Sequence, residues 1–428
     1  MAGKQRGLSL TMATALVMGN MIGSGVFLLP ASLAPLGWAV VPGWIITIAG
    51  SLVLAALLSR LTLAMPERQG VVALVEAALG ETTGFFVGWS YWVSIWTATA
   101  TIAIAAISYL SLFWPVLKDR PGLGVLAAIG LLWLMTVLNL FGARQAGRFQ
   151  LVTLALKIIP LLVVMALAGW ALLKGSAHMI PLPDSDAFTG QAINAAGVLT
   201  LWAMLGFESA SVAADKVADP VRTIPCATLW GTAMAGVIYI FSSCSIVLML
   251  PAAQLAQSAA PFADFVHNYW GGGAALLIAA FAAVSAIGAL NGWVLLQGEL
   301  PLAMARDGRL PAWLARAKAD GTPTVALVGS TIVASLLLCA SGSQTLGDVF
   351  TTTALLSTSA SLWLYLAIAV AALRLAVMRI LAVAGAGYAL WALWGAGWQI
   401  SGASLILMAS GLPMLWWARS GRTLPRQP

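Results

Sequence analysis

The chain has 428 residues, of which 61% are hydrophobic and only 8% are charged, whereas a soluble globular domain carries roughly 25% charged residues. This composition excludes a soluble fold. The net charge of +7 does not indicate nucleic-acid binding either, because the basic residues are spread over loops and do not gather on one face.

Twelve apolar stretches follow one another, each near or above the ~20 residues that a helix needs to span a bilayer. Backbone groups in lipid have to be hydrogen-bonded within a helix or a closed barrel, and these runs lack the alternation of barrel strands. The sequence therefore predicts an all-α polytopic membrane protein. The expected spans are 9–32, 38–63, 82–115, 122–143, 148–173, 188–214, 225–251, 269–304, 323–341, 346–373, 380–398 and 400–418.

The basic residues predict the orientation. Assigning the loops alternately to two sides puts Lys118, Arg120 and Lys174 on one side and seventeen basic residues on the other. The positive-inside rule places the larger group, and both termini with it, in the cytoplasm. The larger group is Lys4, Arg6, Arg60, Arg68, Arg144, Arg148, Lys216, Arg222, Arg306, Arg309, Arg316, Lys318, Arg374, Arg379, Arg419, Arg422 and Arg426.

The first span is too long for the apolar core of a signal peptide and lacks a small-residue cleavage site, so we expect it to be retained. The three cysteines, Cys226, Cys244 and Cys339, stand at unrelated spacings, which indicates neither a disulfide framework nor a metal site. No metal and no cofactor is expected.

Two spans are interrupted. The stretch GNMIGSGVFLLP, residues 19–30, puts Gly-Ser-Gly inside the first span, although glycine costs about 1 kcal/mol relative to alanine in a helix interior. The sixth span, with the stretch LTLWAMLGFESAS, is interrupted at Gly206 and the charged Glu208. Since five spans separate them, the two helices enter the membrane from opposite sides, and such a pair indicates a transporter site near mid-membrane. We expect one transporter domain over 1–428, with the two breaks in corresponding positions of two inverted halves.

A broken helix exposes backbone amides at the start of one half and carbonyls at the end of the other. These groups complement the carboxylate and the ammonium of a zwitterionic amino acid. We expect Ser24 and Gly25 to offer amides to the carboxylate, and Met21, Trp202 and Leu205 to offer carbonyls to the amino group. The alternative is that Gly-Ser-Gly is a small-residue contact between packed helices.

The motifs GNMIGSGVFLLPASLAPLG, LWAMLGFESASVAADKVADPVRTIPCAT and GWVLLQGELPLAMARDGRLP resemble the amino acid, polyamine and organocation superfamily of transporters. Within it they are most similar to bacterial arginine/agmatine and lysine/cadaverine antiporters. The resemblance runs along nearly the whole chain. It implies a 5+5 inverted repeat with broken first and sixth helices, in which 1–173 is the first repeat, 188–373 is the inverted second repeat and 380–418 holds two extra C-terminal helices. It also implies location in a bacterial inner membrane, alternating access, and exchange of an amino acid for its decarboxylated product.

The resemblance also implies roles for single residues. Trp293 stacks on a flat cationic group and closes a middle gate. The substrate-binding residues are Asn20, Met21, Ile22, Ser24, Gly25, Ser94, Ile95, Thr99, Trp202, Leu205, Trp293 and Ser357, with 20–25 and 202–208 forming a backbone clamp. The gating or pH-sensing residues are Tyr91, Trp202, Glu208, Trp293 and Tyr365.

The third span departs from the pattern of the arginine antiporters, which carry asparagine, cysteine and methionine where this chain has Thr99, Ile95 and Ile102. The carbonyls of Ser94 and Ile95 remain, but a side-chain amide for the guanidinium is lost. The pocket is thus less polar, which favours neutral substrates as an alternative.

Two ionisable residues lie inside expected spans. Lys157 is nine residues beyond Arg148, about 13 Å deeper along a helix, where an ammonium needs partners. In other branches of the superfamily a lysine of the fifth helix fills the place of a sodium ion, and the resemblance implies that Lys157 contacts carbonyls of the broken first helix. The alternatives are a lysine paired only for structure, and a Glu208 that only holds the unwound segment through nearby hydroxyls.

These observations predict a sodium-independent antiporter that exchanges a basic amino acid for its decarboxylated polyamine, of the arginine/agmatine type. The alternative is an exchanger or exporter of neutral amino acids, with proton coupling left open, and a receptor on a transporter scaffold also stays open. Two histidines and one central carboxylate do not indicate an enzyme, and no charge ring or filter motif indicates a channel. The expected partners are a small amino acid or polyamine, the lipid bilayer and a second copy of the chain, but no nucleic acid.

Overall fold

The computed structural model describes residues 9–23, 25–68, 70–120, 122–141, 143–183, 188–208 and 219–422. All regular elements in these ranges are helices, which confirms the all-α prediction. The first half contains α1 Leu10–Met21, α2 Gly25–Leu33, the 3-10 helix η1 Ala34–Ala39, α3 Val40–Ala64, α4 Val71–Leu79, α5 Glu81–Leu110, α6 Val116–Asp119, α7 Leu123–Leu140 and α8 Ala143–Leu173.

The second half begins with α9, Gly190–Met204. It continues with α11 Pro220–Met249, α12 Ala252–Ala256, α13 Pro261–Trp270, α14 Gly272–Arg306, η4 Ala312–Ala315, α15 Thr324–Ala340 and α16 Leu346–Arg374. The last three helices are α17 Arg379–Gly395, α18 Gly397–Ala409 and α19 Leu412–Arg422.

Eight segments of the described chain are long and apolar enough to cross a membrane, and the expected count of twelve crossings stays a prediction. The eight are Gly25–Ala64, Glu81–Leu110, Leu123–Leu140, Leu156–Leu173, Val221–Met249, Gly272–Arg306, Leu346–Arg374 and Gly397–Ser420. Two shorter apolar helices, Leu10–Met21 and Thr324–Ala340, fall where the first and ninth spans are expected.

Several expected spans end at different residues in the structure. The span expected at 82–115 ends at Leu110, because turns follow and Pro115 begins the separate short helix α6 without an N–H to continue the ladder. The span expected at 269–304 starts at Gly272, since Gly271, at φ 89°, separates α13 from α14. The first span is two helices, α1 and α2, as its Gly-Ser-Gly sequence predicts.

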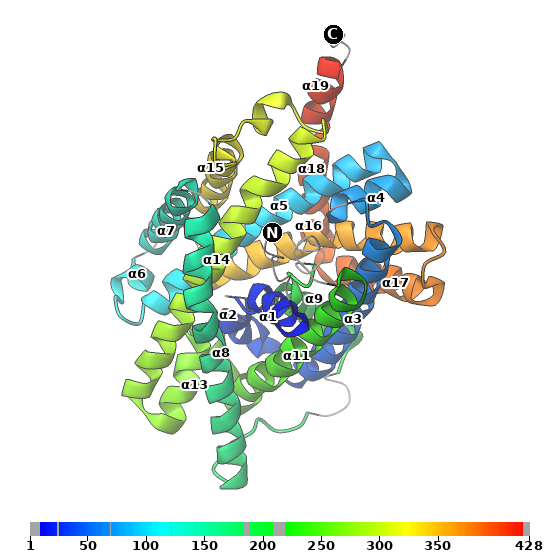
Figure 1. Ribbon diagram of the computed structural model, residues 1–428. Coiled ribbons are helices and arrows are strands. Elements are labelled where there is room, and N and C mark those ends of the chain that lie inside the picture. The colour runs from blue at the N-terminus through cyan, green and yellow to red at the C-terminus, as the bar shows by residue number, and fades with distance from the viewer. Residues whose placement is uncertain are drawn as a thin grey trace, which may run out of the picture.

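The two short helices α1 and α2 lie near the centre of the molecule (Figure 1), and α2 contacts both α5 and α16. α1 packs on α11, α3 packs on α9 and α11, and α5 lies between α14 and α16. In its most apolar window α5 is 94% buried, whereas α7 and the apolar part of α8 are 39% buried. α5 is therefore the interior helix, and α7 and α8 present one side to lipid.

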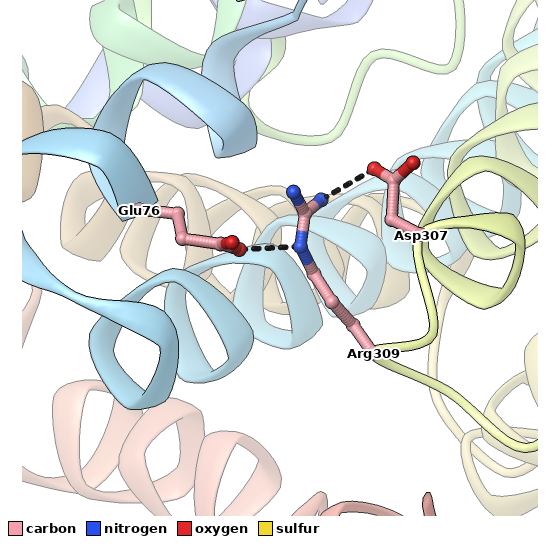
Figure 2. A network of polar contacts seen from close by, with 3 residues as sticks. All are labelled: Glu76, Asp307 and Arg309. Carbon is pink, nitrogen blue, oxygen red and sulfur yellow. Dashed lines mark ion pairs between the residues drawn. The ribbon is translucent and has the colours of Figure 1, made fainter. Parts of the chain in front are cut away.

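An ion cluster joins α4 to the end of α14. Arg309, 8% exposed, pairs through Nε with Glu76 of α4 and through a terminal nitrogen with Asp307 at 2.9 Å. Figure 2 shows its guanidinium between the two carboxylates. Arg309 thus differs from a freely solvated loop charge, because its side chain holds the loop after α14 against α4.

Candidate functional site at the helix breaks

The break in the first span lies between Met21 and Gly25. Ile22 is extended, at φ −72° and ψ 93°, and its N–H still bonds the carbonyl of Met18 at 2.7 Å. Ser24, expected to offer an amide and a hydroxyl, lies outside the described residues. A side chain at Gly25 would come within 3.2 Å of the Cα of Ala203, so glycine is what lets α2 approach α9 this closely.

The end of α9 forms the second side of the site, opposite the break between α1 and α2. The helix ends at Met204, Leu205 is extended at φ −62° and ψ 144°, and Gly206 has φ +107°, a conformation that favours glycine. A Cβ at Gly206 would lie 3.1 Å from the carbonyl oxygen of Asn20. The two interruptions are thus in direct contact, with the end of α9 against the end of α1.

Between the breaks lies a small cavity of about 20 Å³, which is room for roughly one water molecule. Among the described residues, it has no charged side chain in its lining. A substrate of several heavy atoms therefore needs side chains or helices to move. The lining residues are Asn20, Met21, Gly23, Gly25, Ile102, Trp202, Ala203, Leu205 and Trp293.

Six of the twelve expected substrate-binding residues line this cavity: Asn20, Met21, Gly25, Trp202, Leu205 and Trp293. Trp202 is 5% exposed, and its indole Nε1–H has no hydrogen-bond partner in the described chain. An unpaired buried donor beside a cavity is available to a ligand oxygen. Three further lining residues were not among the expected substrate-binding residues, but Gly23 and Ala203 fall within the expected clamp ranges 20–25 and 202–208, and Ile102 was expected as an apolar part of the pocket.

The other expected contacts lie behind this lining. Ser357 of α16 donates its hydroxyl to the carbonyl of Ser94 at 2.8 Å, and the Ser94 hydroxyl pairs with that of Ser361. These bonds join α5 to α16. Ile22 and Ile95 are buried, at the end of α1 and in α5 respectively.

Thr99 of α5 is also fully buried and hydrogen-bonded within the protein. Its hydroxyl donates to the carbonyl of Trp96 at 2.8 Å and to Oε1 of Gln297 at 3.1 Å. The sequence interpretation did not single out Gln297. A buried amide inside an apolar span is a signal that could have found it.

Three of the five expected gating residues, Tyr91, Glu208 and Tyr365, meet at Glu208, two residues after Gly206. The Tyr91 hydroxyl donates to Oε1 of Glu208 at 2.7 Å, and the Tyr365 hydroxyl donates to Oε2 at 3.4 Å. The backbone N–H of Gly206 donates to Oε2 at 3.2 Å. The ring of Phe207 stacks on Tyr365 with centroids 5.1 Å apart. The carboxylate therefore ties α5 and α16 to the break after α9.

Lys157 lies on the other side of the first break. Its side chain is fully buried, and Nζ donates to the carbonyl oxygen of Gly19 at 3.0 Å. Gly19 belongs to the last turn of α1, where carbonyls lose their helical partners and carry the negative end of the helix dipole. The Lys157 side chain thus contacts a carbonyl of the broken first helix, at the place where the resemblance implies such a contact.

The sequence as a whole matches the amino acid permease family over residues 8–421. The chain is 35% identical to the cadaverine/lysine antiporter of Escherichia coli over 331 residues, which cover 77% of this chain and 74% of the antiporter. It is 29% identical to the putrescine transporter PotE of Escherichia coli over 435 residues, or 99% of this chain and 97% of that one.

Two solved structures share the fold. The manganese transporter of Eremococcus coleocola has a TM-score of 0.58 and 14% identity, and covers 96% of this chain and 94% of its own. MhsT, solved with L-phenylalanine, has a TM-score of 0.57 and 17% identity, and covers 95% of this chain and 100% of its own. The predicted resemblance and fold class are thereby confirmed, and the chain belongs to the amino acid permease family of membrane transporters.

Proposed function

We propose that this transporter is a sodium-independent antiporter that exchanges a basic amino acid for its decarboxylated diamine at the cavity between the two helix breaks. The supporting observation is the cavity itself, where backbone groups of both breaks and two indoles meet. Carbonyls at the end of α1 suit an ammonium, and amides at the start of α2 suit a carboxylate. The unpaired Nε1–H of Trp202 is a further donor for the carboxylate.

The far end of the substrate faces Trp293. An indole attracts an ammonium or a guanidinium, by about 0.5–2 kcal/mol depending on how far both are desolvated. Because the lining has no charged side chain among the described residues, this aromatic contact would carry much of the preference for a cation. The same lining includes Ile102, which suits an alkyl chain.

A linear substrate with a primary ammonium fits this setting better than a guanidinium. The names of the relatives refer to cadaverine, lysine and putrescine, which all carry such ammonium groups. Thr99, which stands where the arginine antiporters have an asparagine, gives its hydroxyl to Trp96 and Gln297. The proposed pair is therefore lysine and cadaverine, with arginine and agmatine as the competing pair.

In this proposal the two halves that move against each other during alternating access are 1–173 and 188–373. The two extra helices at 380–418 lie outside these halves, and both termini are in the cytoplasm. Trp202 and Trp293 form the middle gate, and Tyr91, Glu208 and Tyr365 form the outer gate. Lys157 fills the place of a sodium ion. The remaining contacts, Ile22, Ser24, Ser94, Ile95 and Ser357, would reach the substrate only once the cavity widens. A homodimer completes the proposed assembly.

The test is exchange in proteoliposomes made from the purified full-length chain. Vesicles loaded with unlabelled lysine, arginine or leucine are given labelled cadaverine, agmatine or leucine, with and without sodium. We expect internal lysine to accelerate cadaverine uptake, with no requirement for sodium. Acceleration by neutral amino acids alone would overturn the proposal in favour of a neutral exchanger.

The Trp293→Leu variant tests the site within the same assay. Trp170, a half-exposed tryptophan of α8, provides the matched control as Trp170→Leu. We expect Trp293→Leu to abolish exchange and Trp170→Leu to retain it. Full exchange by Trp293→Leu would show that the cation is recognised elsewhere.

A further inference from the structure

The side-chain amide of Gln297 is the centre of a buried hydrogen-bond network next to the cavity. Gln297 is fully buried in α14. Its Oε1 accepts from the Thr99 hydroxyl of α5 at 3.1 Å, and its Nε2 donates to the Thr331 hydroxyl of α15 at 2.9 Å. Its backbone carbonyl accepts from the Ser330 hydroxyl at 3.0 Å. A buried amide with both ends satisfied fixes its neighbours, because breaking either bond leaves a polar group unpaired.

This network extends to a fourth helix, α7. The Thr331 hydroxyl pairs with that of Thr136 in α7 at 2.8 Å, and the indole N–H of Trp92 in α5 donates to Ser330 at 2.9 Å. Helices in a membrane gain little from hydrophobic contact with one another, so such bonds between helices set their relative positions.

The positions of Gln297 and Thr99 place this network next to the cavity. Gln297 is four residues after Trp293 on α14, and Thr99 is three residues before Ile102 on α5, so each pair shares a helix face. Trp293 and Ile102 both line the cavity. The Thr99–Gln297 bond therefore fixes the distance between the two walls that enclose the far end of a bound substrate.

The bond also changes what α5 offers to a substrate. A hydroxyl has one proton, and that of Thr99 is shared between the carbonyl of Trp96 and Oε1 of Gln297. Thr99 lies outside the lining of the cavity. A guanidinium presents five donors in a plane and needs acceptors beside it, whereas an ammonium stacked on an indole needs fewer.

From this arrangement we infer that Gln297 is a positioning residue that sets substrate selectivity by holding Thr99 away from the cavity and fixing Ile102 opposite Trp293. This inference rests on the proposed function and specifies it further. It assigns to the Gln297–Thr99 pair the preference for a primary ammonium over a guanidinium.

The test uses substitutions that keep shape and remove polarity. Gln297→Met leaves the volume nearly unchanged and removes the acceptor that draws the Thr99 hydroxyl towards α14, while the bond to the carbonyl of Trp96 remains. Thr99→Val removes the hydroxyl and keeps the branched side chain. The measured quantity is the ratio of kcat/KM for agmatine to that for cadaverine in exchange for lysine. We expect Gln297→Met to raise this ratio about tenfold, the size of one hydrogen bond to a charged group. In the double variant the freed hydroxyl is gone, so the ratio should fall below that of Gln297→Met and equal that of Thr99→Val alone, in which the bond between the two walls is also broken.

A second buried amide provides the matched control. Asn194 of α9, 3% exposed, donates to the carbonyl of Trp391 in α17 at 2.9 Å and also joins two helices. Asn194→Leu is expected to lower thermal stability. It should also lower transport, by the same factor for every substrate. A selectivity shift that is equal in both variants would mean that Gln297 has only a structural role.

The outcomes separate the two proposals. If the wild type exchanges diamines and Gln297→Met leaves the ratio unchanged, the inference about Gln297 is wrong and the proposed function stands. If the wild type takes only neutral amino acids, the proposed function fails, and the ratio of leucine to alanine transport tests the fixed distance between Ile102 and Trp293. An unchanged leucine-to-alanine ratio in Gln297→Met then overturns the inference. If Gln297→Met does not fold, Thr99→Val tests the inference alone, because it breaks the same bond. An unchanged ratio of agmatine to cadaverine transport in Thr99→Val would then contradict the inference that this bond fixes the distance between Ile102 and Trp293.

Discussion

The two helix breaks each have one buried ionisable residue beside them, and the two are held in different ways. Glu208, 3% exposed, accepts hydrogen bonds from two phenols and a backbone amide. Lys157, fully buried, has one hydrogen bond to the described part of the chain, to the carbonyl of Gly19. The carboxylate belongs to a network that spans α5, α16 and the end of α9, whereas the ammonium makes a single contact with the end of α1.

This difference predicts different tasks for the two side chains. Removing the Glu208 carboxylate leaves several buried donors without an acceptor, so its main effect is on how the helices are held together. Removing the Lys157 ammonium leaves one helix-end carbonyl unpaired, so its main effect is on the local electrostatic potential at the break. We therefore expect Glu208 to act mainly by holding the helices in position and Lys157 mainly by changing the electrostatic potential at the break.

The largest effect is expected for Glu208→Ala. Two phenolic hydroxyls and the N–H of Gly206 lose their acceptor, and each unpaired buried donor costs about 1–3 kcal/mol, so exchange should fall about 100-fold or more. The measurement is lysine-driven cadaverine uptake, together with the thermal stability of the purified protein. Glu208→Gln keeps an oxygen acceptor and should lose less. Exchange above half of the wild-type rate in Glu208→Ala would show that the network does not couple the helices.

Lys157→Met should reduce exchange about tenfold. The substitution keeps a long unbranched side chain and removes only the charge that balances the last turn of α1, an effect of about 1–2 kcal/mol in a buried setting. If the ammonium acts by charge, sodium should restore part of the rate in this variant and have no effect on the wild type. The rate is measured in sodium and in choline buffers. Equal rates for the variant in both buffers would contradict the hypothesis that Lys157 takes the place of a bound sodium ion.

The two phenols of the Glu208 network should differ from one another. The hydroxyl of Tyr91 lies 2.7 Å from the carboxylate and that of Tyr365 lies 3.4 Å from it. A shorter bond to a charged acceptor is the stronger one. We expect Tyr91→Phe to lower exchange about fivefold and Tyr365→Phe about twofold, by the same uptake assay. The reverse order would mean that the ring of Tyr365, stacked on Phe207, matters more than its hydroxyl.

Much of the fold was predictable because its main signals are local. Apolar runs predicted the long helices, and glycines predicted the two breaks, where α1 ends at Met21 and α9 ends at Met204. The split at Gly271 was not predicted. Gly271 is the first of three consecutive glycines, and the expected span 269–304 runs across them, because glycine is tolerated inside helices as well as between them.

The site was predictable in its backbone part and less so in its side-chain part. The motifs around Gly25 and Trp202 lead directly to the cavity. The bond between Thr99 and Gln297 joins residues 198 positions apart, and that pairing depends on which faces of α5 and α14 meet. Periodicity within one apolar helix does not determine its neighbours, because all sides of such a helix are similar in hydropathy.

The smallest effect is expected for Tyr109→Phe, which isolates the part played by charge. The phenol of Tyr109 is as buried as that of Tyr91, but its hydroxyl donates to the carbonyl of Phe27 at 2.7 Å and accepts from the N–H of Phe262 at 3.3 Å. A hydrogen bond between neutral groups is worth about 0.5–1.5 kcal/mol, against about 1.5–3 kcal/mol for one to a charged group. Exchange by Tyr109→Phe should therefore stay within about twofold of wild type, with a small loss of thermal stability. If Tyr109→Phe lowers exchange as much as Tyr91→Phe does, the charge of Glu208 is not what distinguishes its network, and any buried phenol that joins α5 to another element would serve equally well.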